Sequence, residues 1–295
     1  MQIGAFELRE PVPELRDPHM FIVLQPWIDV GSVGSLAVGT LERQFAAQEL
    51  GRLRRPGTFY DFTRYRPMLY REEGRRRVEV PNTVARYAHW PERHDLVFLH
   101  ALEPHQHGED FVESVAALAE HLGVRRSCQV GAMYGAGPHT RPLGLTGSAS
   151  EGPVQEQLTA LGVRSSTYEG PTSIMTLASE MARERGVATL HLLVQLPPYA
   201  RLEQDFRGQE TLLRVLDALY GFGVDLEPIA QQGARQYAEL TRAVQRDPAA
   251  QALVRQLEQA YDAQAQQESR EGPPPPLPPA VERLLREMEE GRGPS

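Results

Sequence analysis

The sequence predicts an α/β protein: a three-layer α/β/α sandwich around a mostly parallel central sheet. Short apolar runs alternate with amphipathic helical segments along most of the chain. Strands that are apolar throughout are typical of parallel sheets with helices on both faces. The 295 residues, 41% of them hydrophobic, also suffice for a large core.

The core elements follow one another in a regular order. Four strands are predicted from short, largely apolar segments, at residues 21–25, 96–99, 127–133 and 188–194. Five helices are each predicted from apolar residues at helical spacing, from the turn at 29–35 to about residue 50, and at 109–122, 153–161, 173–185 and 207–220. Two alternating segments around Glu-Glu-Gly, 68–71 and 77–80, predict a β-hairpin.

The chain divides into an N-terminal arm (1–20), the core (21–232), a helical extension (233–267) and a proline-rich tail (268–295). The extension is interrupted at Asp247, and Pro248 is expected to start its second helix. The apolar stripe of that helix should pack against the core or a neighbouring protomer. The tail is expected to be a disordered polyproline-like spacer with a short helix at 281–290.

The 31 basic side chains are all arginine, against 39 acidic residues and a formal net charge of −8. This balance gives no global support for binding nucleic acid or an anionic membrane. The absence of lysine excludes Schiff-base chemistry and a P-loop. We therefore expect no cofactor, no nucleic acid and no membrane as partner.

The single cysteine, Cys128, allows no internal disulfide and suits a reducing cytoplasm. It lies in a predicted core strand, which favours a buried, unreactive thiol over a nucleophile. No stretch approaches the length of a membrane span. We expect a cytoplasmic protein.

A glycine turn at Asp29-Val-Gly31-Ser32-Val-Gly34-Ser follows the first strand and opens a helix. This geometry can present free backbone N–H groups to an anion. The turn lacks the glycine spacing of a dinucleotide site and the lysine of a P-loop. The alternative is that its glycines permit close packing of helix on sheet, with Asp29 or Ser32 as the cap.

Three polar residues, His139, Thr140 and Arg141, follow another core strand. Ligands in open α/β folds bind at loops of this kind, and arginine can grip a carboxylate or phosphate with two hydrogen bonds. The alternative is a rigid turn whose arginine pairs with an acid from a helix or a neighbouring subunit.

Two further turns carry candidate ligand-binding residues. Glu169 and Thr172 precede a helix, where Thr172 or Ser173 could simply be the N-cap. Tyr199 closes the last core strand and could stack on a ligand or plug the end of the sheet.

A cluster of acidic and histidine side chains resembles a set of metal ligands: His100, Glu103, His105, His107, Glu109 and Asp110. It lies on a predicted loop without the fixed spacing of a zinc site. A solvated loop is the simpler interpretation, and we predict no metal.

Four motifs in order resemble the bacterial branch of the PAC2 (proteasome assembly chaperone 2) family. They are Trp27-Ile-Asp-Val-Gly-Ser-Val-Gly34, Pro138-His-Thr-Arg-Pro142, Glu169-Gly-Pro-Thr-Ser173 and Pro197-Pro-Tyr199, with Leu257-Glu258 and Tyr261-Asp262 in the extension. The last core motif of the branch usually reads Pro-His-Tyr, and Pro198 replaces the histidine here.

The resemblance implies a fold like that of nucleoside phosphorylases and assembly into homo-oligomers or family heteromers. It also implies a link to proteasome assembly, because archaeal and eukaryotic members are assembly chaperones. Some members dock on the proteasome with a hydrophobic-Tyr-any residue tail. This sequence reads Arg292-Gly-Pro-Ser295 there, so direct docking is not expected.

Three functions remain open from the sequence. The first is a non-enzymatic, chaperone-like assembly protein that binds itself and another protein. The second is a phosphorylase-like binder or enzyme for an anion or nucleoside, using the glycine turn and the loop at 139–141. The third is a metal-dependent hydrolase built on His100, His105 and His107.

Overall fold

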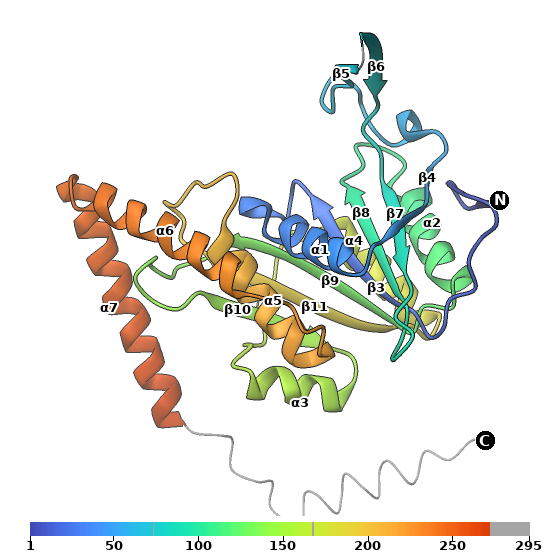
Figure 1. Cartoon of the computed structure of the whole chain (residues 1–295). Coiled ribbons are helices and arrows are strands. Elements are labelled where there is room, and N and C mark those ends of the chain that lie inside the picture. The colour runs from blue at the N-terminus through green and yellow to red at the C-terminus, as the bar shows by residue number, and fades with distance from the viewer. Residues whose placement is uncertain (73, 167, 272–295) are drawn as a thin grey trace, which may run out of the picture.

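A nine-stranded sheet runs through the centre of the molecule, with helices on both faces (Figure 1). The structure is a computed structural model that describes residues 1–72, 74–166 and 168–271, without the side chains of 267–271. The short helix predicted at 281–290, and nearly all of the proline-rich tail, lie outside the described residues.

The strands follow the spatial order β1-β2-β4-β7-β8-β3-β9-β11-β10. Their bounds are β1 Gln2–Ile3, β2 Phe6–Leu8, β3 His19–Gln25, β4 Gln48–Leu53, β7 Val84–Ala88, β8 Leu96–Leu102, β9 Arg126–Tyr134, β10 Gly144–Ala149 and β11 Ala188–Leu196. The four predicted core strands are β3, β8, β9 and β11, which lie side by side.

The α/β class is confirmed, but the prediction of a mostly parallel sheet is wrong. In the described chain, β3 pairs in parallel with β8 and β9, and β9 with β11, whereas the five outer pairings are antiparallel. The central strands are buried on both faces, so they have the largely apolar sequences from which parallel strands were predicted.

The helices form a layer on each face of the sheet. Their bounds are α1 Val33–Gln44, α2 Gly108–His121, α3 Gly152–Ala160, α4 Ile174–Glu184, α5 Phe206–Tyr220, α6 Glu227–Val244 and α7 Pro248–Glu271. Helices α2 and α4 pack on one face, and α1, α3 and α5 on the other. The three-layer arrangement is therefore confirmed.

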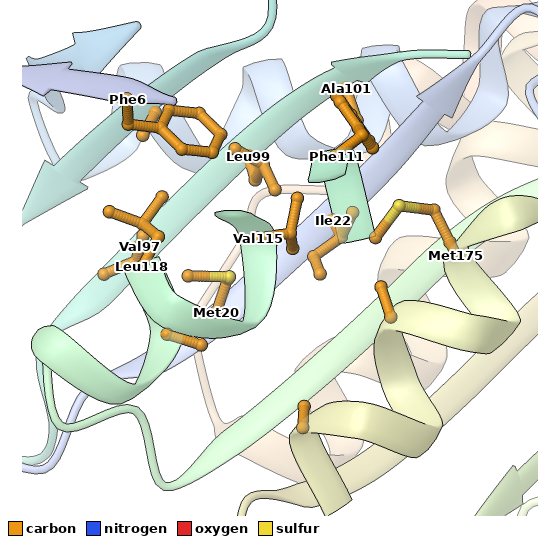
Figure 2. Packing of buried hydrophobic residues seen from close by; sticks show 14 of the residues in the cluster. Phe6, Met20, Ile22, Val97, Leu99, Ala101, Phe111, Val115, Leu118 and Met175 are labelled. Atoms are coloured by element: carbon orange, nitrogen blue, oxygen red, sulfur yellow. The ribbon is translucent and has the colours of Figure 1, made fainter. Parts of the chain in front are cut away.

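Strand β3 shows how the sequence builds two cores. Met20, Ile22 and Leu24 face the layer of α2 and α4, while Phe21 and Val23 face the layer of α1 and α5. Successive side chains of a strand point to opposite faces, so an unbroken apolar run is required here. Figure 2 shows the first of these cores, where side chains of β3 and β8 meet those of α2 and α4.

Helix α1 ends earlier than predicted. It stops at Gln44, and the segment expected to continue it as far as residue 50 enters β4 instead. Phe45 keeps its apolar contact with the core from the connecting turn. Apolar spacing alone therefore placed the helix end about six residues too late.

The predicted hairpin is confirmed as β5 (Met68–Glu72) and β6 (Arg75–Glu79). It forms a separate two-stranded sheet that projects from the molecule (Figure 1). The predicted helix start at Pro248 is also confirmed.

Both ends of the predicted core have structure of their own. The N-terminal arm contributes β1 and β2, which extend the sheet because β2 pairs with β4 and β1 pairs with β2. Helix α6 begins at Glu227, and Gly233 lies inside it, against Arg207 of α5. In the described chain, no helix is both long and apolar enough to cross a membrane.

Two stacked histidines lie at the amino-terminal edge of the parallel strands. His19, at the start of β3, and His94 have ring centroids 3.9 Å apart, and the ring of Tyr220 meets both edge-on. Burial, followed by repulsion from His94 and Arg126, lowers the pKa of His19 to about 3. The pKa of His94 is lowered as well, chiefly by burial. The fold therefore favours the neutral rings.

Acid should destabilise the fold through this pair. The unfolded chain binds a proton at His19 near the ordinary pKa of 6.5, but the folded chain does so only near pH 3. Stability should therefore fall as the pH drops below about 6.5, by roughly 1 kcal/mol per pH unit for one such group. Urea unfolding of His19→Gln across this range should give a flatter profile than the parent. The same change at the exposed His121 is the control, and parallel profiles for all three proteins would contradict the prediction.

Candidate functional site

The loops that follow β3, β9 and β11 lie at one edge of the sheet, because these strands are parallel. They contain the glycine turn after β3, the segment 135–143 after β9 and the segment 197–205 after β11. Most of the residues predicted to bind a ligand are therefore brought to this edge.

Asp29 caps helix α1. Its Oδ1 accepts hydrogen bonds from the backbone N–H groups of Gly34 (2.7 Å) and Ser35 (3.1 Å), and its Oδ2 accepts one from the Ser35 hydroxyl (2.5 Å). Burial raises the pKa of Asp29, and these donors partly offset that effect. The helix N-terminus thus already holds a carboxylate from its own chain.

The glycines of the turn allow close packing. A Cβ on Gly34 would lie 2.9 Å from the carbonyl oxygen of Val130 in β9. Gly31 has a φ of +61°, and a Cβ there would lie 2.9 Å from the Cβ of Asp205. Ser32 donates its hydroxyl to the carbonyl of Glu203 at 2.9 Å. These contacts account for the turn without a ligand.

His139 is buried in a chain of hydrogen bonds. Its Nδ1 lies 2.7 Å from the Tyr199 hydroxyl, which also accepts the His139 backbone N–H at 2.9 Å. Its Nε2 lies 3.1 Å from Oγ1 of Thr241 in α6. The tyrosine can then donate to Nδ1 and the imidazole to Thr241, which fits a neutral ring. Burial also lowers the pKa of His139, which agrees with a neutral imidazole.

Thr140 and Arg141 hold helix α7. Arg141 donates two hydrogen bonds to the carboxylate of Asp262, from Nε (2.8 Å) and from a terminal nitrogen (2.7 Å). Its other terminal nitrogen lies 3.3 Å from Glu258, whose carboxylate also accepts the Thr140 hydroxyl at 2.6 Å. We call these four residues the α7 clamp. The guanidinium of Arg141, which was predicted to hold an anion, therefore binds two carboxylates of its own chain.

Asp205 is a buried residue that the sequence reasoning missed. Its Oδ1 caps α5 at the Gly208 N–H (2.8 Å), and its Oδ2 accepts the hydroxyl of Tyr237 in α6 (2.9 Å). Its backbone N–H donates to the carbonyl of Gly31 at 2.8 Å. Burial raises its pKa. An aspartate directly before the first residue of a helix is a capping signal that could have revealed it.

Arg207 connects the same elements. Its guanidinium lies 4.8 Å from the centroid of the Tyr237 ring and donates to the carbonyl of His139 at 3.4 Å. The arginine therefore joins α5 to α6 and to the loop after β9. The three edge loops and the helices α6 and α7 thus form one connected hydrogen-bonded unit.

Glu169 and Thr172 lie in a different part of the molecule. They precede α4, which belongs to the layer opposite α1 and α5. Ser173 is the N-cap residue of α4, and the Thr172 hydroxyl bonds to that of Thr176 at 2.7 Å. The structure therefore does not join these two residues to the His139 network.

The histidine-rich loop makes separate local contacts. His100 lies in β8 and bonds to Glu42 at 2.8 Å, while His105 Nδ1 accepts the Asp61 backbone N–H at 3.1 Å. The residues that the structure describes include no group of three His, Cys, Asp or Glu side chains arranged to hold a metal. Cys128 is fully buried, and burial raises the pKa of its thiol.

Comparison with known proteins confirms the resemblance drawn from the motifs. The family model described as the PAC2 family matches residues 23–244. No protein of curated function matches the sequence.

Solved structures share the fold. A PAC2 family protein from Streptomyces avermitilis is 26% identical, with a TM-score of 0.69 over 77% of this chain and 95% of its own. A Mycobacterium tuberculosis protein described as a proteasome-assembly chaperone homologue is 22% identical, with a TM-score of 0.70 over 80% and 99%. A Pyrococcus furiosus protein described as an archaeal proteasome activator is 17% identical, with a TM-score of 0.63 over 83% and 100%.

The close packing at the glycine turn can be tested with two glycines of α1. Gly34→Ala should lower the free energy of unfolding by about 1–3 kcal/mol, because the new methyl group meets β9 backbone. Gly39→Ala is the matched control, since its Cβ would meet nothing closer than an arginine side-chain atom at 3.6 Å. It should stabilise the protein by about 0.5–1 kcal/mol through helix propensity. Urea denaturation measures both, and equal effects would contradict the assignment.

The α7 clamp should control the local stability of α7. Arg141→Ala removes the two hydrogen bonds to Asp262, so backbone amides of residues 249–266 should exchange with deuterium faster than in the parent. The exchange of the central strands should not change. Arg255→Ala, at an exposed position of α7, is the control. Unchanged α7 exchange in Arg141→Ala would show that apolar packing alone holds the helix.

Proposed function

Because the chain belongs to the PAC2 family, we propose that it is a non-enzymatic, chaperone-like assembly protein that self-associates and binds a second protein. The observation that carries this proposal is the α7 clamp. The side chains best suited to grip a small anion, Arg141 foremost, instead fix a helix of the same chain.

The same edge offers few free groups for chemistry. The N-termini of α1 and α5 are capped by the buried carboxylates of Asp29 and Asp205. His139 is held by hydrogen bonds on both ring nitrogens. A catalytic acid or base has to reach its substrate, whereas in the described chain these groups are held by hydrogen bonds to other parts of it.

Helices α6 and α7 provide the surface proposed for the partner. They meet at the turn between them and diverge from it at the side of the molecule, and α7 extends well beyond the sheet (Figure 1). Val254 is buried, whereas Leu253 beside it is 42% exposed. A long helix with part of its apolar surface uncovered is typical of an element that binds another helix or groove.

The descriptions of two relatives support a role in assembly. The M. tuberculosis protein is described as a proteasome-assembly chaperone homologue, and the P. furiosus protein as a proteasome activator. We extend to this chain the general feature that these descriptions share, which is binding to other proteins.

A phosphorylase-like function is the second candidate. An open hollow beside the glycine turn is lined by Ser32 and Arg201, among other residues. Arg201 is exposed there and could meet a phosphate or a nucleotide.

The two functions can be separated by comparing variants of the purified chain. A chain ending at Asp247 lacks α7 and should lose a protein that co-purifies with the full chain from the native host. Arg183→Ala on α4 should retain that protein. Mass spectrometry identifies the co-purified proteins. Equal recovery with and without α7 would contradict the proposed surface.

Thermal-shift titration provides the complementary measurement. Phosphate, nucleosides and nucleotides should leave the melting temperature of the parent unchanged. A stabilisation by any of them that Arg201→Ala abolishes would favour the phosphorylase-like function instead.

A further inference from the structure

A groove of about 520 Å³ lies beside the end of β4. One wall is formed by residues 52–58 and Phe62, and the other by Val80 and Asn82, which follow β6. The side chain of Asn82 accepts the Leu53 backbone N–H at 3.1 Å and donates to the Leu53 carbonyl at 3.0 Å. These two hydrogen bonds join the walls. We call this hollow the β4 groove.

The turn that forms the first wall is anchored in the core. Phe59 and Tyr60 are buried, whereas Phe62 is 36% exposed. Gln106 also holds the turn, by donating to the carbonyl of Thr58 at 3.0 Å. A surface fixed in this way loses little conformational freedom when a ligand binds.

Arginine is concentrated in the same wall. Residues 52–66 include five arginines and one aspartate, which leaves 26 arginines against 38 acidic residues elsewhere. The remainder of the chain thus has a net charge of −12, and all five arginines of the segment are exposed. The negative net charge of the whole chain therefore conceals a local basic surface.

Two arginines that line the groove have no acidic partner. Arg52 binds the carboxylate of Glu49 with two hydrogen bonds, of 2.8 and 2.7 Å. Within the described residues, by contrast, neither Arg54 nor Arg55 forms an ion pair. Arg54 donates only to the neutral amide oxygen of Gln2, at 3.0 Å. Both guanidinium groups can therefore bind carboxylates of a ligand.

The groove also exposes apolar surface beside these charges. Val80 is 40% exposed, and it lines the groove together with the ring of Phe62. Arginine and aromatic side chains are the residue types enriched where proteins bind each other. A complementary ligand has both acidic and aliphatic groups.

The surroundings of the groove limit the length of the anion that it can hold. Glu7 lines the groove itself, and Glu10 and Glu49 line the next hollow along β2 and β4. A nucleic acid strand that continued beyond the groove would meet these carboxylates and the acidic remainder of the chain. A peptide segment of a few residues would not extend so far.

We propose that the β4 groove binds a short acidic segment of a partner protein, in which carboxylates flank aliphatic side chains. The carboxylates would bind Arg54 and Arg55, and an aliphatic side chain would pack on Phe62 and Val80. Clusters of arginine recognise acidic motifs in this way. The inference rests on the binding of a second protein proposed above, and it assigns that protein a contact separate from α6 and α7.

Three fluorescein-labelled peptides test the chemistry of the ligand. The first repeats Glu-Glu-Leu three times, the second has glutamine for every glutamate, and the third has serine for every leucine. In fluorescence anisotropy, the parent should bind the first peptide at least about tenfold more tightly than the other two, because only the first has both kinds of group. Its affinity should fall as sodium chloride is added, since exposed charges are screened.

Two variants assign the contacts within the groove. Arg54→Glu/Arg55→Glu should weaken binding of the Glu-Leu peptide at least about tenfold, because carboxylates then face carboxylates. Phe62→Ala should weaken binding of the Glu-Leu peptide but not of the Glu-Ser peptide, since only leucine packs on the ring. The matched control is Arg43→Glu/Arg235→Glu, which makes the same charge change at exposed positions of α1 and α6. It should bind like the parent, and circular dichroism verifies that every variant is folded.

Four results would overturn the proposal. They are equal affinity for the acidic and the amide peptide, parent-like binding by Arg54→Glu/Arg55→Glu, tighter binding of a short poly(U) RNA than of the Glu-Leu peptide, and a smaller mass of this variant in analytical ultracentrifugation. The third would assign the groove to nucleic acid, and the fourth to a contact between copies of this chain.

Co-purification from the native host separates this proposal from the proposed function. A partner that is lost from both Arg54→Glu/Arg55→Glu and the chain ending at Asp247 would support both proposals, given the expected peptide results. A partner lost only from the shortened chain would overturn the groove contact and leave the chaperone-like function intact. A full chain that binds the Glu-Leu peptide but co-purifies with no protein would overturn that function instead.

Discussion

The buried carboxylate of Asp205 is the contact on which the arrangement of the edge loops and C-terminal helices depends. It caps α5, binds the hydroxyl of Tyr237 in α6 and, through its backbone, contacts the glycine turn after β3. A buried carboxylate without such donors is strongly destabilising. The capped helix, the turn and α6 must therefore be in place together, which makes the position of α6 part of the core fold.

The polar residues at this edge connect parts of the chain, although ligand sites of other α/β proteins occupy the same position. Asp29 takes the place that an anion would take at α1, and His139 spans from Tyr199 to α6. Hydrogen bonds between buried polar groups fix geometry because an unpaired group there is costly. The edge is thus suited to holding a binding surface in one orientation.

The sequence predicted the parts of the fold that depend on local pattern. The central strands are largely apolar, but β1, β2 and β10 are short or rich in glycine and could not be told from loops. The sequence identified most residues of the candidate site, but only some of the contacts between them. Arg141 and Asp262 are 121 positions apart, so only folding shows that they pair. Asp205 could have been predicted only as the N-cap of α5, and its contact with Tyr237 of α6 appears only once the two helices are packed.

The α7 clamp has a mechanical consequence. From Pro248 to Asp262, α7 rises about 21 Å at about 1.5 Å per residue, so the helix acts as a lever with its pivot at the turn after α6. A rotation of about 10° at the pivot would move Asp262 by roughly 4 Å and break its hydrogen bonds with Arg141. One arginine far from the pivot therefore sets the angle of the whole helix. A force on the outer end of α7 would therefore act first on Arg141, in the loop that follows β9.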